Sequence, residues 1–173
     1  FKPTGLGAVI VGNNGTNTQL TLSSYTLADT TGVIGNSGGS RSNSVVVAGP
    51  SGRWVNASSL TIGNAGALNQ LVITNGGGVQ NTIATIGGSA SSNLVHVTGM
   101  GSVWSNSSSL LVGSVGTFNR LVISEGGGAG DDAKANAADL AKTLANPIGA
   151  LISVPFQNNM DFGGGPAGDG FQY

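Results

Sequence analysis

Few side chains in this sequence could carry out acid–base or nucleophilic chemistry. Asp29 is the only carboxylate side chain between Phe1 and Ser124, and His96 is the only histidine in the chain. Glycosidases and polysaccharide-cleaving enzymes need at least two acids, one to donate a proton and one to act as base or nucleophile. The sequence therefore predicts that the chain is not an enzyme and has no catalytic residues.

His96 and the two tryptophans are the remaining candidates for a site. A Ser-His-Asp triad would require His96 beside one of the few aspartates, but "LVHV" places it at an outward position of a strand, which predicts an ordinary surface residue. Trp54 and Trp104 would offer a sugar-stacking surface if both pointed outward. Buried rings that brace a corner would explain their recurrence equally well. Both interpretations stay open at this point.

The glycine-rich motifs predict no cofactor or metal site. "GGAGDDA" from Gly127 fits a calcium-binding repeat, but it occurs once, and a linker with Asp131 or Asp132 as helix cap explains it better. "GGGPAG" from Gly163 has the spacing of a dinucleotide loop, but no helix follows it. Thiolate metal sites are excluded because the chain has no cysteine. We therefore predict no metal, no cofactor and no bound nucleotide.

The composition indicates an exported, β-rich protein. Only 8% of the 173 residues are charged, against about 25% in an ordinary domain, and the polar surface must consist of Ser, Thr and Asn. A net charge of −1 gives no electrostatic basis for binding nucleic acid. No apolar run reaches the roughly 18 residues of a membrane helix. Because the chain begins at Phe1, without an initiator Met, we expect a fragment or a processed product.

Internal repetition is the strongest signal in the sequence. The segment "GPSGRWVNASSLTIGNAGALNQLVITNGGG" begins at Gly49 and "GMGSVWSNSSSLLVGSVGTFNRLVISEGGG" begins at Gly99, so the two copies lie about 50 residues apart. A degraded earlier copy is visible in "VIVGNNGTNTQLTLSS". Residues 1–128 thus hold about two and a half copies, which predicts a stack of similar units.

Each copy contains short strands that end in turn residues, with expected centres near residues 46, 61, 72, 84 and 96. Positions that stay apolar between copies alternate with positions that vary, as in strands with one buried face. Val46 and His96 are accordingly predicted to point outward. The predicted inward residues are Val45, Val47, Leu60, Ile62, Leu71 and Ile73, with Val95, Val97, Leu110, Val112, Leu121 and Ile123 one copy later.

Short strands at regular spacing predict an all-β solenoid of stacked coils. Two strands with their turns take about 25 residues, so one repeat of about 50 residues is expected to span two coils. Glycines are expected at the corners, where a positive φ costs them little. Asn69 and Asn119 recur just before strands, which predicts that their amides bond to the backbone at a corner. The more specific prediction is an asparagine ladder that runs along the stack.

These residues carry a resemblance to a known family. Trp54, then "SSLTIG", then "LNQLVITNGGG" resembles the passenger-associated repeat of autotransporter-type bacterial proteins, over about residues 5–128. The resemblance implies a right-handed parallel β-helix without catalytic residues, at the bacterial cell surface, in the outer membrane or extracellular. It implies the function of a structural passenger or stalk, with an adhesive role and a cell-surface or carbohydrate ligand left open.

The composition changes after the repeats. Residues 129–147 are predicted to form a Gly/Ala-rich linker and a short helix, which ends at Asn146 and Pro147. Residues 148–173 are predicted to be the truncated start of a further β region, with one lone strand. Its apolar face would consist of Ile152, Val154 and Phe156.

A second resemblance lies in this last part of the chain. "LANPIGALISVPFQNNMDFGGGP" resembles the entry segment of outer-membrane β-barrel transporters of the phenol-degradation-pathway type. It implies an alternative function, in which the solenoid is an extracellular or periplasmic module of a transporter-like protein. The outer membrane would then be reached through a C-terminal region that the sequence does not include.

Overall fold

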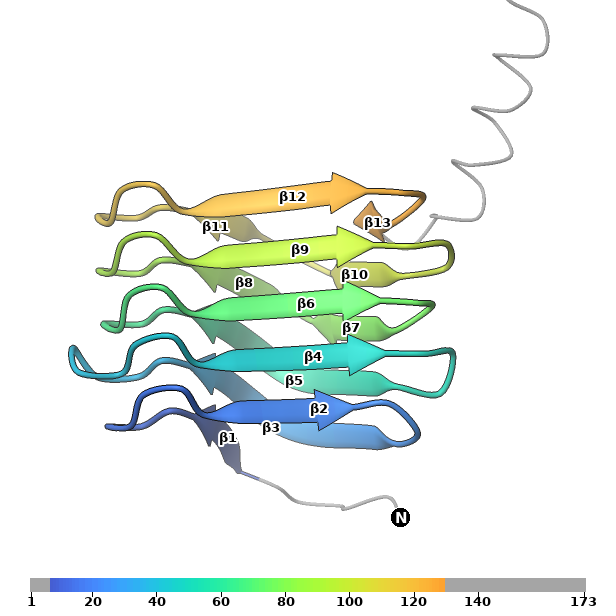
Figure 1. Ribbon diagram of the computed structural model, residues 1–173, viewed down its shortest axis with the longest axis horizontal. Coiled ribbons are helices and arrows are strands. Elements are labelled where there is room, and N and C mark those ends of the chain that lie inside the picture. Colours follow the sequence, from blue (N-terminus) through green and yellow to red (C-terminus); the bar gives the residue numbers. More distant parts are fainter. Residues whose placement is uncertain (1–6, 130–173) are drawn as a thin grey trace, which may run out of the picture. The chain divides into compact units, whose positions relative to one another are not determined.

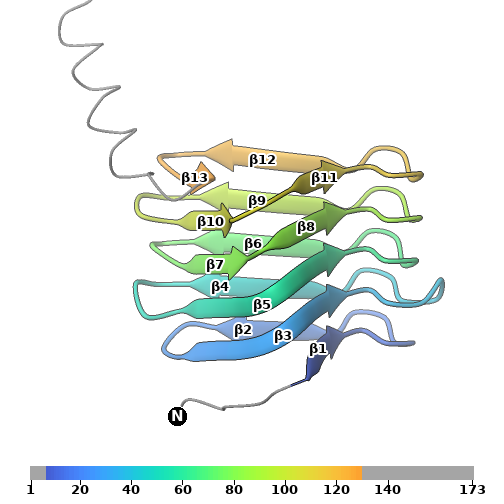
Figure 2. The same cartoon turned by 180° about the vertical axis from the view of Figure 1, so that it is seen from behind.

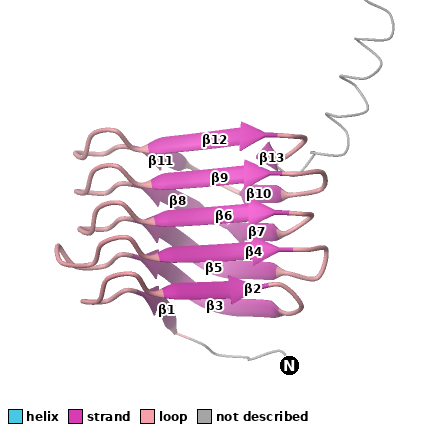
Figure 3. Cartoon of the chain, in the orientation of Figure 1, coloured by secondary structure: helices cyan, strands magenta, loops and turns pink. Residues whose placement is uncertain are grey.

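The computed structural model describes residues 7–129, which form an all-β structure without a helix (Figure 1). The strands are β1 (Ala8–Val11), β2 (Gln19–Leu22), β3 (Thr26–Ile34), β4 (Ser44–Ala48), β5 (Arg53–Ile62), β6 (Gln70–Thr74), β7 (Gly78–Asn81), β8 (Ile83–Ile86), β9 (Leu94–Thr98), β10 (Val103–Asn106), β11 (Leu110–Val112), β12 (Arg120–Ser124) and β13 (Gly128–Ala129). Turns and short loops join them throughout (Figure 3). The fold class predicted for this part of the chain, an all-β parallel solenoid, is confirmed.

The chain winds between two parallel sheets. One sheet has the order β1-β3-β5-β7-β10-β13, with β8 and β11 stacked beside the second half of β5, and the other has the order β2-β4-β6-β9-β12. One column of the second sheet passes through Leu20, Val45, Leu71, Val95 and Leu121. The spacing along this column is nearly constant, so one coil takes about 25 residues. The described residues make about five coils.

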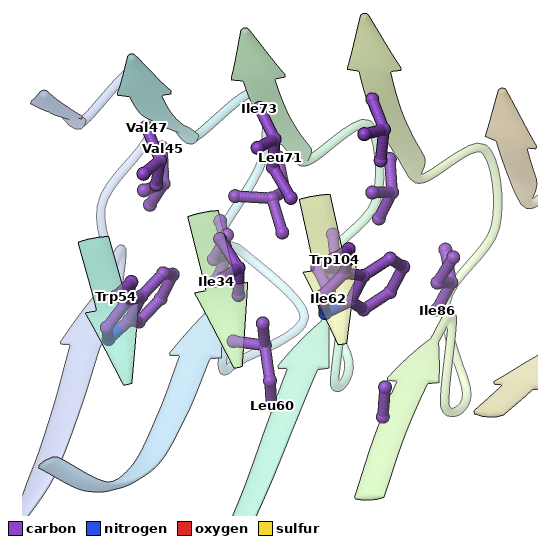
Figure 4. Packing of buried hydrophobic residues seen from close by; sticks show 14 of the residues in the cluster. Ile34, Val45, Val47, Trp54, Leu60, Ile62, Leu71, Ile73, Ile86 and Trp104 are labelled. Carbon is purple, nitrogen blue, oxygen red and sulfur yellow. The ribbon is translucent and has the colours of Figure 1, made fainter. Parts of the chain in front are cut away.

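A single hydrophobic core lies between the two sheets (Figure 4). It forms because inward side chains of one coil lie directly over those of the next, and each coil shields its neighbour from water. All six inward residues predicted for the first copy are fully buried, as are Val95 and Val97 of the second copy. Val46 and His96 lie half-buried on the outer face, paired in one column through Val72, so the predicted strand register is confirmed.

The last described coil differs from the others in exposure. Leu110 and Val112 pair with β8 in the predicted register, and Leu121 and Ile123 pair with β9. Yet Leu110, Val112 and Ile123 are 37%, 42% and 45% exposed, because no described coil lies beyond them. For these three residues the prediction of burial is wrong, although the prediction of their register is right.

An asparagine ladder follows one corner of the stack. The side-chain Oδ1 of Asn69 accepts the backbone N–H of Asn43 at 3.0 Å, and Asn93 and Asn119 repeat this bond to the coil before them at 2.9 Å. At the N-terminal end, Asn43 Oδ1 accepts the N–H of Thr18. The ladder predicted from Asn69 and Asn119 is therefore confirmed, with Asn43 and Asn93 as further members.

The corner geometry explains why the ladder recurs. The residue before each ladder asparagine has a left-handed backbone, with φ between 56° and 61° at Ser42, Leu68, Ser92 and Phe118. Each side chain folds across a glycine of the preceding coil; at Gly35, which has φ +77°, an added Cβ would collide with the Asn69 amide. Glycine is thus required here for its backbone conformation and for its lack of a side chain.

Several strands of the first sheet were not among the predicted centres. They include β3, β7, β10 and the first half of β5, which carry polar and aromatic residues in place of a simple apolar alternation. Figure 2 shows β3 and β5 as long curved strands, whereas later coils divide the same path into β7 and β8, then β10 and β11. A β-bulge between Asp29 and Thr31 accompanies the bend in β3.

The predictions for the end of the chain lie outside the described residues. They are the linker and short helix at 129–147, apart from its first residue, the caps Asp131 and Asp132, and the lone strand with Ile152, Val154 and Phe156. They stay predictions. Within residues 7–129, no helix is long and apolar enough to cross a membrane.

Candidate functional site

His96 lies on the outer face of β9 in a chain of polar contacts. Its Nε2 is 2.9 Å from Ser124 Oγ, which donates to Thr98 Oγ1 at 3.1 Å, and Thr98 Oγ1 in turn donates to Glu125 Oε2 at 3.2 Å. Each hydroxyl has one proton to give, so Nε2 is the donor to Ser124. A general base must instead accept the serine proton. The chain of bonds therefore does not activate Ser124 as a nucleophile.

Asp29, the only aspartate among the described residues, takes no part in this chain. It belongs to β3 in the other sheet, where it accepts a hydrogen bond from Trp54. The described residues therefore contain no Ser-His-Asp triad. They also contain no group of three or more His, Cys, Asp or Glu side chains that could hold a metal ion.

Both tryptophans are fully buried in the core (Figure 4). The idea of an outward sugar-stacking surface made by Trp54 and Trp104 is therefore wrong. They lie in β5 and β10, in one column with Val79 between them, so the two rings do not stack on each other. Each ring is instead a buried member of the hydrophobic core.

A buried carboxyl lies beside the first tryptophan. Trp54 Nε1 donates to Asp29 Oδ2 at 2.8 Å, while the second carboxyl oxygen, Oδ1, is buried without a partner. Burial raises the pKa of Asp29 above its ordinary value, and the hydrogen bond from Trp54 acts in the opposite direction. Asn56, which pairs with Asp29 in the next coil, is 3% exposed, and both polar atoms of its amide lack partners.

The second tryptophan has the corresponding arrangement two coils later. Trp104 Nε1 donates to Asn81 Oδ1 at 2.8 Å, and Asn81 Nδ2 donates to Asn106 Oδ1. The column of Asp29, Asn56, Asn81 and Asn106 thus receives an indole N–H only where the next coil carries a tryptophan. The coil after Asn56 carries Val79, which has no N–H to donate, so the Asn56 amide receives none.

The outer face of the first sheet carries two adjoining hollows, of about 340 Å³ and about 240 Å³. Gln80 and Ser105 line both hollows, so we treat them as one feature, called the outer groove. Polar residues of the smaller hollow include Asn56, Asn81, Thr82 and Ser107. The larger hollow extends over β5, β7 and β10 and contains Arg53.

Arg53 is fixed in the outer groove by the backbone. Its Nη1 donates to the carbonyl oxygens of Gly52 and Gly76, both at 2.9 Å. The arginine side chain lies over Gly78, because a Cβ at Gly78 would come within 2.9–3.1 Å of its Cδ, Nε and Cζ. Within residues 7–129, no carboxylate forms an ion pair with this guanidinium. The outer groove therefore presents a held positive charge.

Sequence reasoning did not find the outer groove. Arg53, Gln80 and Ser105 come from three different coils, and their proximity follows from coil pairing that a single segment does not display. The only local signal for the groove is the glycine run 76–78 and its copy at 126–128. Gly78 has no side chain at an outward position of β7, and this leaves the space that Arg53 occupies.

Comparison with protein-family models, with curated proteins and with solved structures finds no match to this chain. The resemblances to autotransporter passengers and to barrel transporters therefore stay predictions.

Proposed function

We propose that this chain is a non-catalytic structural module, a passenger or stalk, of an exported bacterial surface protein, with an adhesive role for its outer faces. The observation that carries the proposal is the repetition of two devices through successive coils: the buried core and the asparagine ladder. Both can be extended by adding coils, so length is gained by repeating the sequence. An elongated module that separates two parts of a larger protein needs this property.

The exposed chemistry supports the same proposal. Only five charged side chains occur among residues 7–129: Asp29, Arg41, Arg53, Arg120 and Glu125. The outer faces instead present amides and hydroxyls, which can donate and accept hydrogen bonds with neutral partners. Exposed asparagines even continue from coil to coil, since Asn36 Nδ2 donates to Asn13 Oδ1 and Asn64 Nδ2 donates to Asn36 Oδ1.

Two finer features belong to the proposal. The coils wind in the right-handed sense, and each sequence repeat corresponds to two coils. Supporting the second feature, Leu71 and Leu121 occupy equivalent positions of the two sequence copies, and both pair with Val95, one on each side. The alternative role, a module of an outer-membrane transporter, rests on residues outside 7–129 and stays a prediction of the sequence.

Surface labelling of the source bacterium tests this function. Antibodies raised against the exposed turns that contain Met100 and Phe118, 86% and 81% exposed, should bind intact cells that express the full-length protein. Protease added outside the cells should remove this signal while a cytoplasmic marker survives. Labelling that appears only after the cells are permeabilised would refute a surface role.

A further inference from the structure

We propose that the outer groove binds an acidic oligosaccharide, with the Arg53 guanidinium receiving a sugar carboxylate and the groove amides and hydroxyls receiving sugar hydroxyls. The inference rests on the proposed adhesive function for its biological setting, and it names the class of ligand and the site. It does not use the tryptophans, because both are buried.

The dimensions of the groove suit an extended ligand. Its larger hollow runs from Thr26 on β3, across β5 and β7, to Val103 on β10. Neighbouring strands lie about 4.8 Å apart, so three steps along the stack give roughly 15 Å. An oligosaccharide of several sugar units would fit along this path. The smaller hollow adjoins the larger one at Gln80 and Ser105.

Arg53 supplies the specificity for an acid. Its Nη1 is bound to two carbonyl oxygens, which fixes the plane of the guanidinium, while Nε and Nη2 make no hydrogen bond to another described residue. A guanidinium with a free edge binds a carboxylate through two parallel hydrogen bonds. Because the side chain is already held in place, little conformational entropy is lost on binding.

The remaining lining favours a sugar over a peptide. Gln80 and Ser107 offer an amide and a hydroxyl that both donate and accept, as sugar hydroxyls do, and Thr82 adds a hydroxyl oxygen that can accept. An extended peptide would add to a free strand edge or place apolar side chains in pockets. The groove instead lies over the middle of a sheet, where β5, β7 and β10 are already paired with one another.

Calorimetric titration of the whole 173-residue chain tests the site. The probes are tetragalacturonate, neutral maltotetraose and tetraglutamate at equal concentration. We expect tetragalacturonate to bind most tightly, and Arg53→Gln to weaken it by about tenfold or more, the usual effect of losing a charged hydrogen bond. Gln80→Ala should weaken it severalfold. Arg120→Gln, which removes an exposed arginine outside the groove, should leave binding unchanged.

Four results would overturn the inference: no binding of tetragalacturonate at millimolar concentration, equal binding of maltotetraose, equal binding of tetraglutamate, or equal losses for Arg53→Gln and Arg120→Gln. Circular dichroism shows whether Arg53→Gln folds; if it does not, the effect of Gln80→Ala decides. The titration uses purified protein, so its failure leaves the surface location untouched, and cell labelling fails or succeeds independently of it.

Discussion

The two tryptophan sites of the solenoid occupy equivalent positions two coils apart, yet only one of them is built from neutral groups. Trp54 donates its indole N–H to the carboxyl of Asp29, and Trp104 donates its own to the amide of Asn81, both at 2.8 Å. The hydrogen bond from the indole is therefore the same whether the acceptor is aspartate or asparagine. The two sites differ in the other polar atom of the acceptor side chain, which is Oδ1 in Asp29 and Nδ2 in Asn81.

In the second site that atom is an N–H donor: Asn81 Nδ2 donates to Asn106 in the next coil. In the first site it is Asp29 Oδ1, which has no partner although Asn56 is its neighbour in the register. A proton on Oδ1 would provide the missing donor, and the raised pKa of Asp29 acts in that direction. A stacked column thus tolerates an acid best in its neutral form, the form closest to asparagine.

The largest effect is expected from removing the first tryptophan. Trp54→Ala should lower the free energy of unfolding by about 3–5 kcal/mol, because it leaves a cavity. Both variants remove the indole donor of a buried oxygen, but the loss should be larger for Trp54→Ala, because Asp29 is then left without any partner whereas Asn81 still donates to Asn106. Urea unfolding of both variants measures the difference in the free energy of unfolding. A greater loss for Trp104→Ala would contradict the proposed difference between the two tryptophan sites.

Replacing the amide of the second tryptophan site by a carboxyl, as in the first site, should lower the free energy of unfolding by less than removing Trp54. Asn81→Asp replaces the N–H that binds Asn106 by an oxygen, so we expect a loss of about 1–3 kcal/mol at neutral pH. Acidification should restore part of this loss by protonating the new carboxyl. A variant as stable as the parent at pH 7 would show that the amide donor at this position is dispensable.

The reverse change should stabilise the protein and alter its pH dependence. Because the folded-state pKa of Asp29 is raised above the ordinary 3.8, its contribution is fully present below that value and is lost as pH rises through the folded-state pKa. Asp29→Asn should therefore gain about 1 kcal/mol at neutral pH and little in acid. Thermal unfolding of both proteins across this pH range measures the gain, and parallel curves would contradict the assignment.

The smallest effect, none, is expected from removing metal ions. Chelator should leave the midpoint of thermal unfolding unchanged, because no cluster of metal-binding side chains occurs among residues 7–129. Chelation also tests the buried oxygens of Asp29 and Asn56 that have no hydrogen-bond partner, because carboxylate and amide oxygens are the atoms that bind Ca²⁺. A drop that added Ca²⁺ reverses would contradict this prediction and would promote Asp131 and Asp132 of "GGAGDDA" from helix caps to calcium ligands.

The sequence predicted the second sheet well and the first sheet poorly, for a physical reason. Strands such as Val45–Val47 alternate simply between core and solvent, and comparing copies reveals the alternation. The ladder positions Asn43 and Asn93 are related by the same shift between copies as Asn69 and Asn119, a signal that could have found them.

The pairing of Asp29 with Asn56 could not be read in the same way. Residues at equivalent positions of the two sequence copies lie two coils apart, as Leu71 and Leu121 do on either side of Val95. Asp29 and Asn56 instead lie in adjacent coils, so comparing the copies does not pair them. The offset between adjacent coils also changes from strand to strand in this sheet, and the bulge after Asp29 changes it again within β3. No constant offset therefore connects the pair. The outer groove was missed because its lining comes from several coils.

Cross-linking measures the coil length, on which the equivalence of the two sites depends. The chain has no cysteine, so introduced pairs react without competition. Val46→Cys with Val72→Cys joins residues paired in adjacent coils, at the roughly 4.8 Å strand spacing that a disulfide spans. Val46→Cys with His96→Cys joins positions two coils apart, at about 9–10 Å, which it does not span. We predict that the first pair oxidises to an intramolecular disulfide in the folded protein and that the second does not. Failure of the first pair, or equal cross-linking of the second, would contradict the stacked coils.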